Sequence, residues 1–140
     1  MPFERILVAI DGSDCSNRAF AKALELARVT GATLTAIAIQ GPLPAYAATI
    51  GEVDEVKREK DAFFDTLAAR THEQAARAGS DIDVVVRPGH AAESISEFAT
   101  EGGFDLVVIG SRGHFLHDHL LGSTAERVAQ HAPCPVMIVR

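Results

Sequence analysis

The sequence Leu106–Thr124, LVVIGSRGHFLHDHLLGST, contains the pattern on which our prediction of the fold depends. Four apolar residues, Leu106 to Ile109, precede a glycine-rich segment. A helical pattern follows, opening with Gly122-Ser123-Thr124 and running through Ala125–His131. A short apolar run bounded by glycine is typical of a strand buried on both faces. We therefore predict a strand, a loop and a helix in that order, which is one unit of an α/β fold.

The same segment has the features of a phosphate-binding loop. Glycines let the backbone approach an anion closely, and a helix start offers unpaired N–H groups and the positive end of its dipole. The glycines follow the spacing Gly110-x2-Gly113-x8-Gly122-Ser123. The chain contains neither GxxxxGK[ST] nor GxGxxG, so it has neither a P-loop nor the usual dinucleotide fingerprint. The position of these glycines between a buried strand and a helix start, more than their spacing, favours a binding site.

Strand and helix patterns alternate along the whole chain. We predict strands at Arg5–Ile10, Ala32–Ile39, Ile82–Arg87, Leu106–Ile109 and Val136–Val139, and helices at Ser16–Thr30, Glu52–Ala78, Ala91–Thr100 and Ala125–His131. The long second helix has an apolar stripe that includes Phe63, Phe64 and Leu67. Such alternation implies parallel strands, right-handed crossovers and helices on both faces of one sheet.

Two loops are expected to meet at one edge of this sheet. Asp11 follows the first strand and Gly110 ends the fourth, and ligands of such folds bind beyond the carboxyl ends of the strands. Both loops face one crevice if these two strands are neighbours. Asp11 could contact a ligand there or cap the first helix, and one Asp can do both. Gly110 and Gly113 could also be turn glycines, and Ser123 and Thr124 are good N-cap residues with or without a phosphate.

Composition limits the function classes. The chain has 140 residues, which we expect to form a single domain over residues 1–140, and 47% of them are hydrophobic. Its formal net charge of -6 argues against nucleic-acid binding, which needs a basic face. Cys15 and Cys134 form no disulfide framework and no paired metal spacing. The sequence shows no signal peptide and no span for membrane insertion, so a cytoplasmic protein is expected.

The chain resembles the universal stress protein family over nearly its whole length. The resemblance rests on RILVAIDGS at residues 5–13, VVIGSRG at 107–113, GST at 122–124 and HAPCPVMIV at 131–139. It implies a Rossmann-like three-layer α/β sandwich with a five-stranded parallel sheet of order 3-2-1-4-5, and ATP, with or without Mg²⁺, as the ligand. The resemblance assigns Asp11, Gly110, Gly113, Gly122, Ser123 and Thr124 to the nucleotide site and places Ala9 and Ile39 near the adenine. Ile109 and Arg112, the nearest cation to a bound phosphate, complete the predicted site.

One departure from the family pattern bears on this site. Eight residues, His114 to Leu121, separate Gly113 from Gly122, where the nucleotide-binding branch has nine. The loop tip could absorb the missing residue and leave both anchors in place, or the shorter loop could move the backbone donors away from the phosphates. The family also contains members that do not bind nucleotide, so a protein-interaction dimer is the alternative to an ATP-binding regulator.

The loop also contains several side chains of the types that bind metals. His114, His117 and His119, with Asp118, could chelate if the loop folds back on itself, but loop histidines are usually solvated, and no metal site is predicted. No catalytic group is predicted either, because Ser13, Ser111 and Ser123 lack a histidine and a carboxylate at a recognisable spacing. Asp11 and Arg112 could fill two of the roles in phosphoryl transfer, which leaves slow ATP hydrolysis or phosphotransfer as a further alternative.

The final apolar strand suggests an assembly. Val136–Val139 is expected at a sheet edge, where an apolar strand favours pairing with a second copy about a two-fold axis. The family resemblance also implies a homodimer through this strand. Together with the residues, the resemblance predicts a non-enzymatic, ATP-binding regulatory dimer with a protein partner that the residues do not identify, and the role in the stress response is implied by the resemblance alone.

Overall fold

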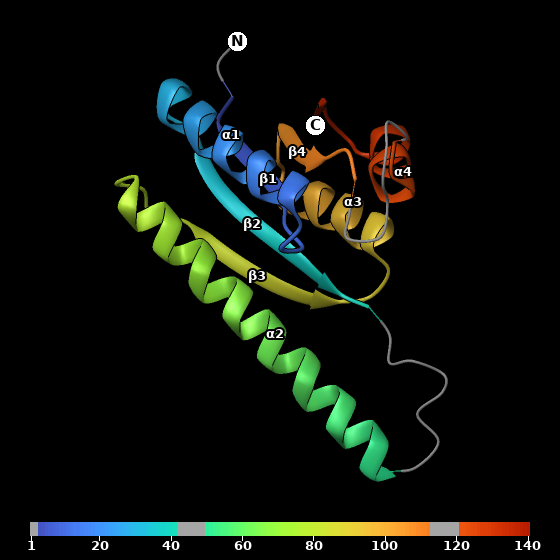
Figure 1. Ribbon diagram of the computed structural model, residues 1–140. Helices are drawn as coiled ribbons and strands as arrows, with labels where there is room; N and C mark the ends of the chain where they lie inside the picture. Colours follow the sequence, from blue (N-terminus) through green and yellow to red (C-terminus); the bar gives the residue numbers. More distant parts are fainter. Residues whose placement is uncertain (1–2, 42–49, 113–120) are drawn as a thin grey trace.

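A computed structural model describes residues 3–41, 50–112 and 121–140 of the chain (Figure 1). Its centre is a parallel sheet in the order β3-β2-β1-β4-β5. The strands are β1 (Arg5–Ala9), β2 (Thr33–Gln40), β3 (Asp83–Pro88), β4 (Leu106–Gly110) and β5 (Val136–Val139). The predicted α/β fold with strand order 3-2-1-4-5 is therefore confirmed.

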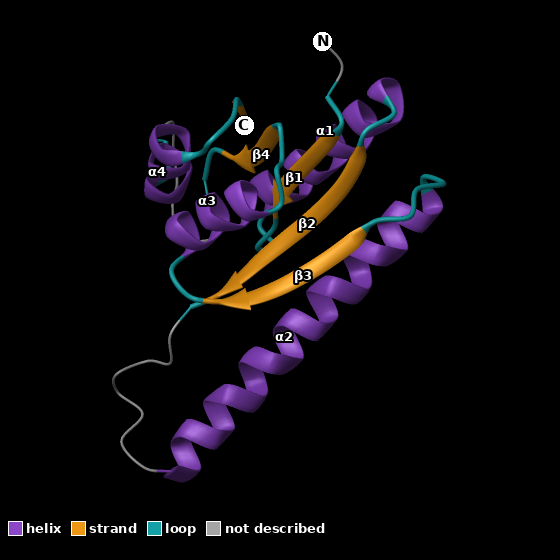
Figure 2. Cartoon of the chain, turned by 180° about the vertical axis from the view of Figure 1, so that it is seen from behind, coloured by secondary structure: helices purple, strands orange, loops and turns teal. Residues whose placement is uncertain are grey.

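Helices cover both faces of the sheet, as Figures 1 and 2 show from opposite sides. Their bounds are α1 (Asp14–Thr30), α2 (Ile50–Arg77), α3 (Ala91–Glu101) and α4 (Ser123–His131). Apolar residues of α1 and α2 pack on one face, and those of α3 and α4 on the other. The first turns of α2 extend past the carboxyl ends of β2 and β3 (Figure 2). The result is the three-layer, Rossmann-like sandwich that the alternating patterns predicted.

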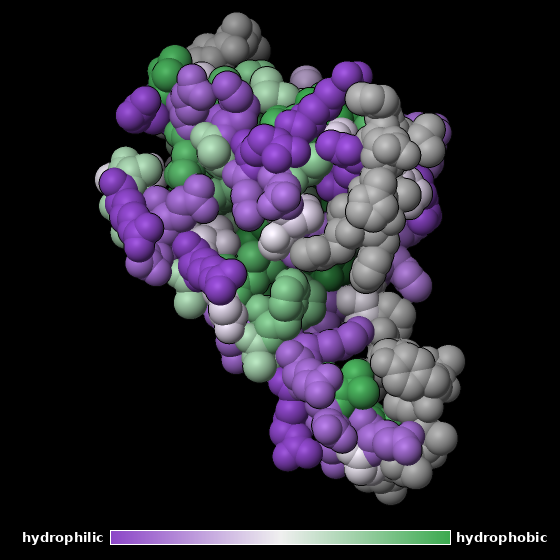
Figure 3. Space-filling view, viewed as in Figure 1, coloured by the Kyte–Doolittle hydropathy of each residue, from purple (hydrophilic) through white to green (hydrophobic). Residues whose placement is uncertain are grey.

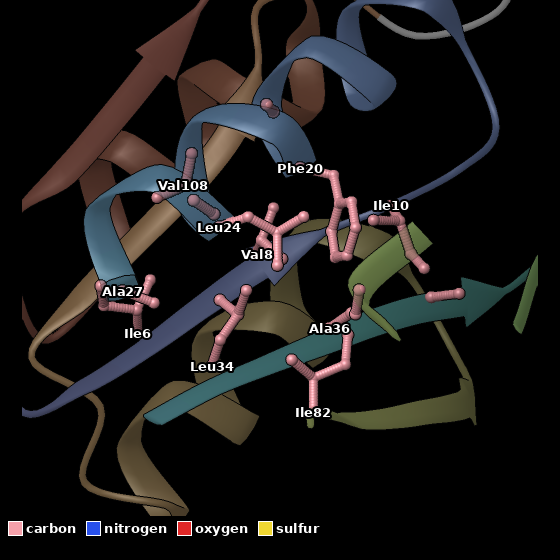
Figure 4. Packing of buried hydrophobic residues seen from close by; sticks show 14 of the residues in the cluster. Ile6, Val8, Ile10, Phe20, Leu24, Ala27, Leu34, Ala36, Ile82 and Val108 are labelled. Carbon is pink, nitrogen blue, oxygen red and sulfur yellow. The ribbon is translucent and has the colours of Figure 1, made fainter. Parts of the chain in front are cut away.

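The core consists of one apolar layer on each side of the sheet. Along β1, Ile6 and Val8 point toward α1 and α2, while Leu7 between them points toward α3 and α4. All three are fully buried, which accounts for the unbroken apolar sequence of this strand. Burial of each such side chain contributes about 1.5–3 kcal/mol relative to exposure. Figure 4 shows Val8, Phe20 of α1 and Ala36 of β2 within the first layer.

The long helix α2 differs in detail from its predicted stripe. Phe64 packs against the core and Leu67 is buried, but Phe63 is 46% exposed, so its inclusion in the stripe was wrong. The two rings meet edge to face with centroids 5.1 Å apart. Adjacent residues on a helix point about 100° apart, so Phe63 and Phe64 cannot both face the sheet. In the view of Figure 3, apolar side chains appear between α1 and α2, and mostly hydrophilic ones surround them.

Strand order places two loops beside each other. β1 pairs with β2 on one side and with β4 on the other, with Val8 opposite Val108. The direction of strand order therefore reverses between β1 and β4, and the predicted adjacency of these strands is confirmed. The segment after β1, which begins at Ile10 and contains Asp11, and the segment after Gly110 leave the same edge of the sheet at this point. Within the described residues, no helix is long and apolar enough to cross a bilayer.

Candidate functional site

A cavity of about 360 Å³ opens at the carboxyl ends of β1, β2 and β4. Ala9, Ile39 and Ile109 from the three strand ends and Ala91 and Ile95 from α3 give it an apolar side. Its other side carries hydroxyl, carboxylate and guanidinium groups from the loops after β1 and β4 and from the start of α4. Ligand pockets commonly combine an apolar body with a few convergent polar groups in this way.

The structure brings nine of the ten predicted site residues into the lining of this one cavity. They are Ala9, Asp11, Ile39, Ile109, Gly110, Arg112, Gly122, Ser123 and Thr124. The tenth, Gly113, lies outside the described residues. These nine residues come from positions up to 115 apart in the chain, and the switch point between β1 and β4 brings them together.

The turn after β1 is a hydrogen-bonded unit. One carboxylate oxygen of Asp11 accepts a hydrogen bond from the Ser13 N–H at 2.8 Å, and the Asp11 N–H donates to the Ser16 hydroxyl at 2.9 Å. Gly12 between them has φ = 84°, a conformation that glycine adopts without a steric penalty. The N-cap of α1 is Ser13, whose hydroxyl accepts from the Ser16 N–H. Asp11 therefore does not cap the helix, and its turn places its side chain at the cavity.

Gly110 allows a close contact between β4 and the first turn of α1. A Cβ atom at this position would lie 2.8 Å from the Cys15 carbonyl carbon and 2.9 Å from the Cys15 Cβ. Only a residue without a side chain fits this approach. The glycine that sequence reasoning assigned to a ligand therefore also has a packing role.

The loop that connects β4 to α4 is closed at its base. The Ser111 N–H donates to the Val139 carbonyl of β5 at 2.7 Å, and the Gly122 N–H donates to the Ser111 carbonyl at 2.6 Å. The second bond joins the two ends of the shortened glycine loop directly. Ser111 and Gly122, which flank the loop in the described part of the chain, therefore lie side by side.

The start of α4 faces the cavity without a side-chain cap. Gly122 is the N-cap residue, with φ = -64° and ψ = 149°, and it has no side chain that could bond the first turn. Ser123 and Thr124 are therefore the first two helical residues rather than caps, which corrects the expectation from their residue types. The first N–H groups of a helix have no partner inside it, and together with the helix dipole they favour an anion. This end of the cavity suits a phosphate.

Arg112 brings a positive charge to the same region and also reaches Cys15. Burial acts to raise the pKa of the Cys15 thiol, but hydrogen bonds from Ser111 and Arg112 and the charge of Arg18 outweigh it, so the pKa is lowered. The thiol lies 3.9 Å from the Ser111 hydroxyl and 3.1 Å from an Arg18 nitrogen. The loop after β4 and the first turn of α1 are therefore joined electrostatically as well as by packing.

Sequence reasoning missed several residues of the lining. Ser13, Ser16 and Ser111 supply hydroxyl groups, and Ala91 and Ile95 supply the α3 side. The serines lie next to predicted residues, so the turn sequence Asp11-Gly12-Ser13 was an available signal. The α3 residues gave no comparable signal, because an Ala or Ile on a helix indicates only that the helix is packed.

The charged lining of the cavity is small. Among the described residues that line it, Asp11 and Arg112 are the charged ones. The part of the chain that the structure describes contains no cluster of three His, Cys, Asp or Glu residues that could hold a metal ion. His114, His117, Asp118 and His119 lie outside that part. The arrangement can bind an apolar ring and an anionic group together.

Comparisons with known proteins identify the family and agree with the fold. A model of the universal stress protein family matches residues 2–140. Universal stress protein YxiE of Bacillus subtilis is 32% identical over 147 residues, which cover 99% of each chain. The solved UspA from Lactobacillus plantarum has a TM-score of 0.88 at 25% identity, covering 100% of this chain and 99% of that one. A universal stress protein solved in complex with cAMP has a TM-score of 0.77 at 28% identity, with 100% and 99% covered. The chain belongs to the universal stress protein family.

Proposed function

We propose that this chain binds an adenine nucleotide, ATP in the first place, and acts as a non-enzymatic regulatory dimer in the cytoplasmic stress response. The observation that carries the binding proposal is the closed loop base, in which Gly122 bonds to Ser111 beside the uncapped start of α4. It supports the alternative in which the shorter loop leaves its Gly122 end in place beside β4. The cAMP complex of a relative 28% identical to this chain adds support for an adenine nucleotide.

Each part of the nucleotide has a matching part of the cavity. The base would lie against the apolar side formed by Ile39, Ala91 and Ile95. Asp11 would accept hydrogen bonds from the ribose hydroxyls, because a carboxylate is a strong acceptor. The phosphates would bind the first N–H groups of α4, with Arg112 as the nearby cation. Mg²⁺ uses one or two carboxylates plus phosphate oxygens, so a nucleotide-bound Mg²⁺ would fit against Asp11.

The proposal is binding rather than turnover. Phosphoryl transfer needs a carboxylate for Mg²⁺, a cation on the phosphates and a group that positions the nucleophile. Asp11 and Arg112 supply the first two among the described residues of the lining. A regulatory role follows if nucleotide occupancy changes the surface offered to a protein partner.

Nucleotide analysis tests the proposal directly. The purified protein is denatured, and the released small molecules are separated by ion exchange with ultraviolet detection. Calorimetry of the nucleotide-free chain with ATP, ADP, AMP and cAMP then ranks the ligands. Released ATP, or saturable binding of any of the four, is the expected result. Release of mostly ADP would point to slow hydrolysis, and absence of both release and heat would favour a protein-interaction dimer.

A matched pair of variants locates the site. Asp11→Asn keeps an oxygen that can accept from the Ser13 N–H, so the turn is preserved while the negative charge is removed. Asp14→Asn makes the same change on the exposed first turn of α1, outside the cavity lining. We expect nucleotide affinity to change with Asp11→Asn and to stay constant with Asp14→Asn. Equal affinities for both variants would place the nucleotide elsewhere.

A further inference from the structure

A second crevice lies at the amino ends of the strands, at the end of the sheet opposite to the candidate site. It encloses about 380 Å³ and is lined by parts of β1, β2, β3, α2 and α3 and by the turn before β4. We call it the amino-terminal crevice, and its lining includes Arg5, Thr35, Asp83, Val85, Phe98 and Phe104. Its size and its mixture of aromatic and polar side chains fall within the range of small-molecule sites.

One side of the amino-terminal crevice is a column of aromatic rings and guanidinium groups. Phe98 of α3 stacks on Phe104 with ring centroids 5.5 Å apart and an interplanar angle of 28°. The Arg5 guanidinium lies 4.9 Å from the Phe104 centroid, and that of Arg87 lies 4.8 Å from the Phe98 centroid. The ring stacking and the two cation–π contacts each restrict the positions of the Phe98 and Phe104 rings. The crevice therefore has a preformed apolar side.

Arg5 is held in one orientation at an end of the crevice. Its Nε donates to the Gly102 carbonyl at 2.8 Å while its guanidinium stacks on Phe104. Within residues 3–41, 50–112 and 121–140, its two terminal nitrogens make no hydrogen bond and no ion pair. A guanidinium held in this way presents parallel N–H donors that match a carboxylate.

Thr35 and Asp83 lie opposite each other on β2 and β3. Thr35 is only 9% exposed, and its hydroxyl makes no hydrogen bond to any described residue. Ser96 Oγ, and not the Thr35 hydroxyl, is the fully buried side-chain oxygen without a partner among the described residues, so the Thr35 hydroxyl is accessible and can bond a ligand atom at this position. Asp83 is exposed, and its carboxylate makes no ion pair with the described part of the chain. The crevice thus offers a cation at one end, a carboxylate at the other and a hydroxyl between them.

We propose that the amino-terminal crevice binds a small zwitterion with an apolar body, of the dipeptide class. Its carboxylate would pair with Arg5, its ammonium with Asp83, and its side chain would pack on Phe98 and Val85. Arg5 and Asp83 lie on strands two places apart, with axes about 10 Å from each other, and Asp83 is level with Leu7, two residues beyond Arg5, so their backbones are about 12 Å apart. An extended dipeptide spans about 7 Å, and the two protein side chains cover the remaining distance.

The proposal is tested with glycyl-phenylalanine as the probe. Amide chemical shifts of the protein are followed during titration with the dipeptide, its N-acetyl derivative and its C-terminal amide. We expect saturable shifts at residues 35 and 83–85 with a Kd on the order of 1 mM for the free dipeptide. Each derivative should bind about fivefold more weakly, as is typical of losing one exposed ion pair. Absence of saturable shifts, or shifts confined to the cavity at the carboxyl ends, would overturn the proposal.

Two variants assign the ends of the ligand. Asp83→Asn should remove the preference for the free dipeptide over the N-acetyl derivative, and Arg5→Gln should remove the preference over the amide. Asp81→Asn and Arg28→Gln are the controls, because both residues are exposed and neither lines the crevice. If Arg5→Gln fails to fold, Asp83→Asn on the exposed strand end still decides the orientation. Preferences unchanged in Asp83→Asn would contradict the proposal.

Discussion

Gly110 has two roles, one in the lining of the cavity and one in the packing of α1 on β4. Gly110 ends β4 at the cavity, and it also lets the first turn of α1 approach the strand. A Cβ there would meet backbone atoms of Cys15, which cannot rotate away as the end of a long side chain could. The packing demand holds whether or not a ligand is bound. Binding data on a Gly110 variant would therefore mix two effects, and its stability should be measured first.

We predict that Gly110→Ala lowers the free energy of unfolding by about 1–3 kcal/mol, as overpacking of a closely packed contact usually does. Chemical denaturation of both proteins measures the change. Gly41→Ala is the matched control, because a Cβ at Gly41 meets no atom of the described residues within 4 Å. A Gly110→Ala protein as stable as the Gly41→Ala protein would mean that α1 moves away from β4 at little cost.

The shifted pKa of the Cys15 thiol leads us to predict that the stability of the fold depends on pH. Its pKa in the folded chain is lowered from the usual 9.0, because hydrogen bonds from Ser111 and Arg112 and the charge of Arg18 outweigh burial. A thiol whose pKa is lower in the folded chain than in the unfolded chain stabilises the fold. This stabilisation is complete above the pKa of the unfolded chain, and it is lost as the pH falls through the pKa of the folded chain. The unfolding free energy of the native chain relative to Cys15→Ala should therefore increase as the pH rises toward 9.0.

Denaturant unfolding of both proteins at a series of pH values gives this difference. The raised pKa of Cys134, caused by burial and the charge of Asp105, acts in the opposite direction, but it is present in both proteins and cancels. A difference that stays constant with pH, or falls, would show that the thiolate of Cys15 is not stabilised.

At the scale of elements, a substitution at the start of α4 can weaken phosphate binding without destabilising the fold. Ser123 is the first helical residue, and its N–H has no partner within the helix. Proline is favoured at this position because it needs no donor there, and Gly122 already has the extended conformation that precedes proline. We predict that Ser123→Pro leaves the thermal midpoint nearly unchanged and weakens nucleotide binding about tenfold, the effect of one charge-assisted hydrogen bond.

Ser123→Ala is the control for this prediction, since it removes the hydroxyl and keeps the N–H. Calorimetry with ATP and a thermal melt of each variant provide the two measurements. Full affinity in Ser123→Pro would show that this N–H does not contact the nucleotide. Equal losses in both variants would assign the effect to the hydroxyl instead.

The elements themselves could be predicted from the sequence more fully than the contacts between them. Gly31 and Gly79 follow the ends of helices and both have φ = 75°, and helix ends of this kind can be predicted from the presence of glycine. Which of Phe63 and Phe64 packs against the core depends on the rotation of α2 about its axis. Two adjacent aromatic residues in the sequence do not determine that rotation. The contact of Gly110 with Cys15 joins segments 95 positions apart, and no local pattern encodes it. The part of the cavity formed by α3 was missed for the same reason.

For the whole molecule, the two edges of the sheet differ in what they offer to a partner. β3 carries Asp83 at its start and Arg87 near its end, and it ends at Pro88. Charges and proline discourage pairing at an edge. β5 is wholly apolar, pairs with β4 on one side, and leaves Ile138 37% exposed. The β5 edge is therefore the better candidate for the proposed homodimer, in agreement with the expectation from the sequence.

We predict that Ile138→Lys converts the protein from dimer to monomer, because pairing of two β5 strands about a two-fold axis would bring the two lysines close together. Val29→Lys is the control, since Val29 is 76% exposed at the end of α1, away from this edge. Sedimentation equilibrium measures the mass of each protein at the same concentration. The expected result is a dimer for the native chain and Val29→Lys, and a monomer for Ile138→Lys with an unchanged circular dichroism spectrum. A native chain that sediments as a monomer would contradict the dimer itself. A dimeric Ile138→Lys protein would place the interface on another surface.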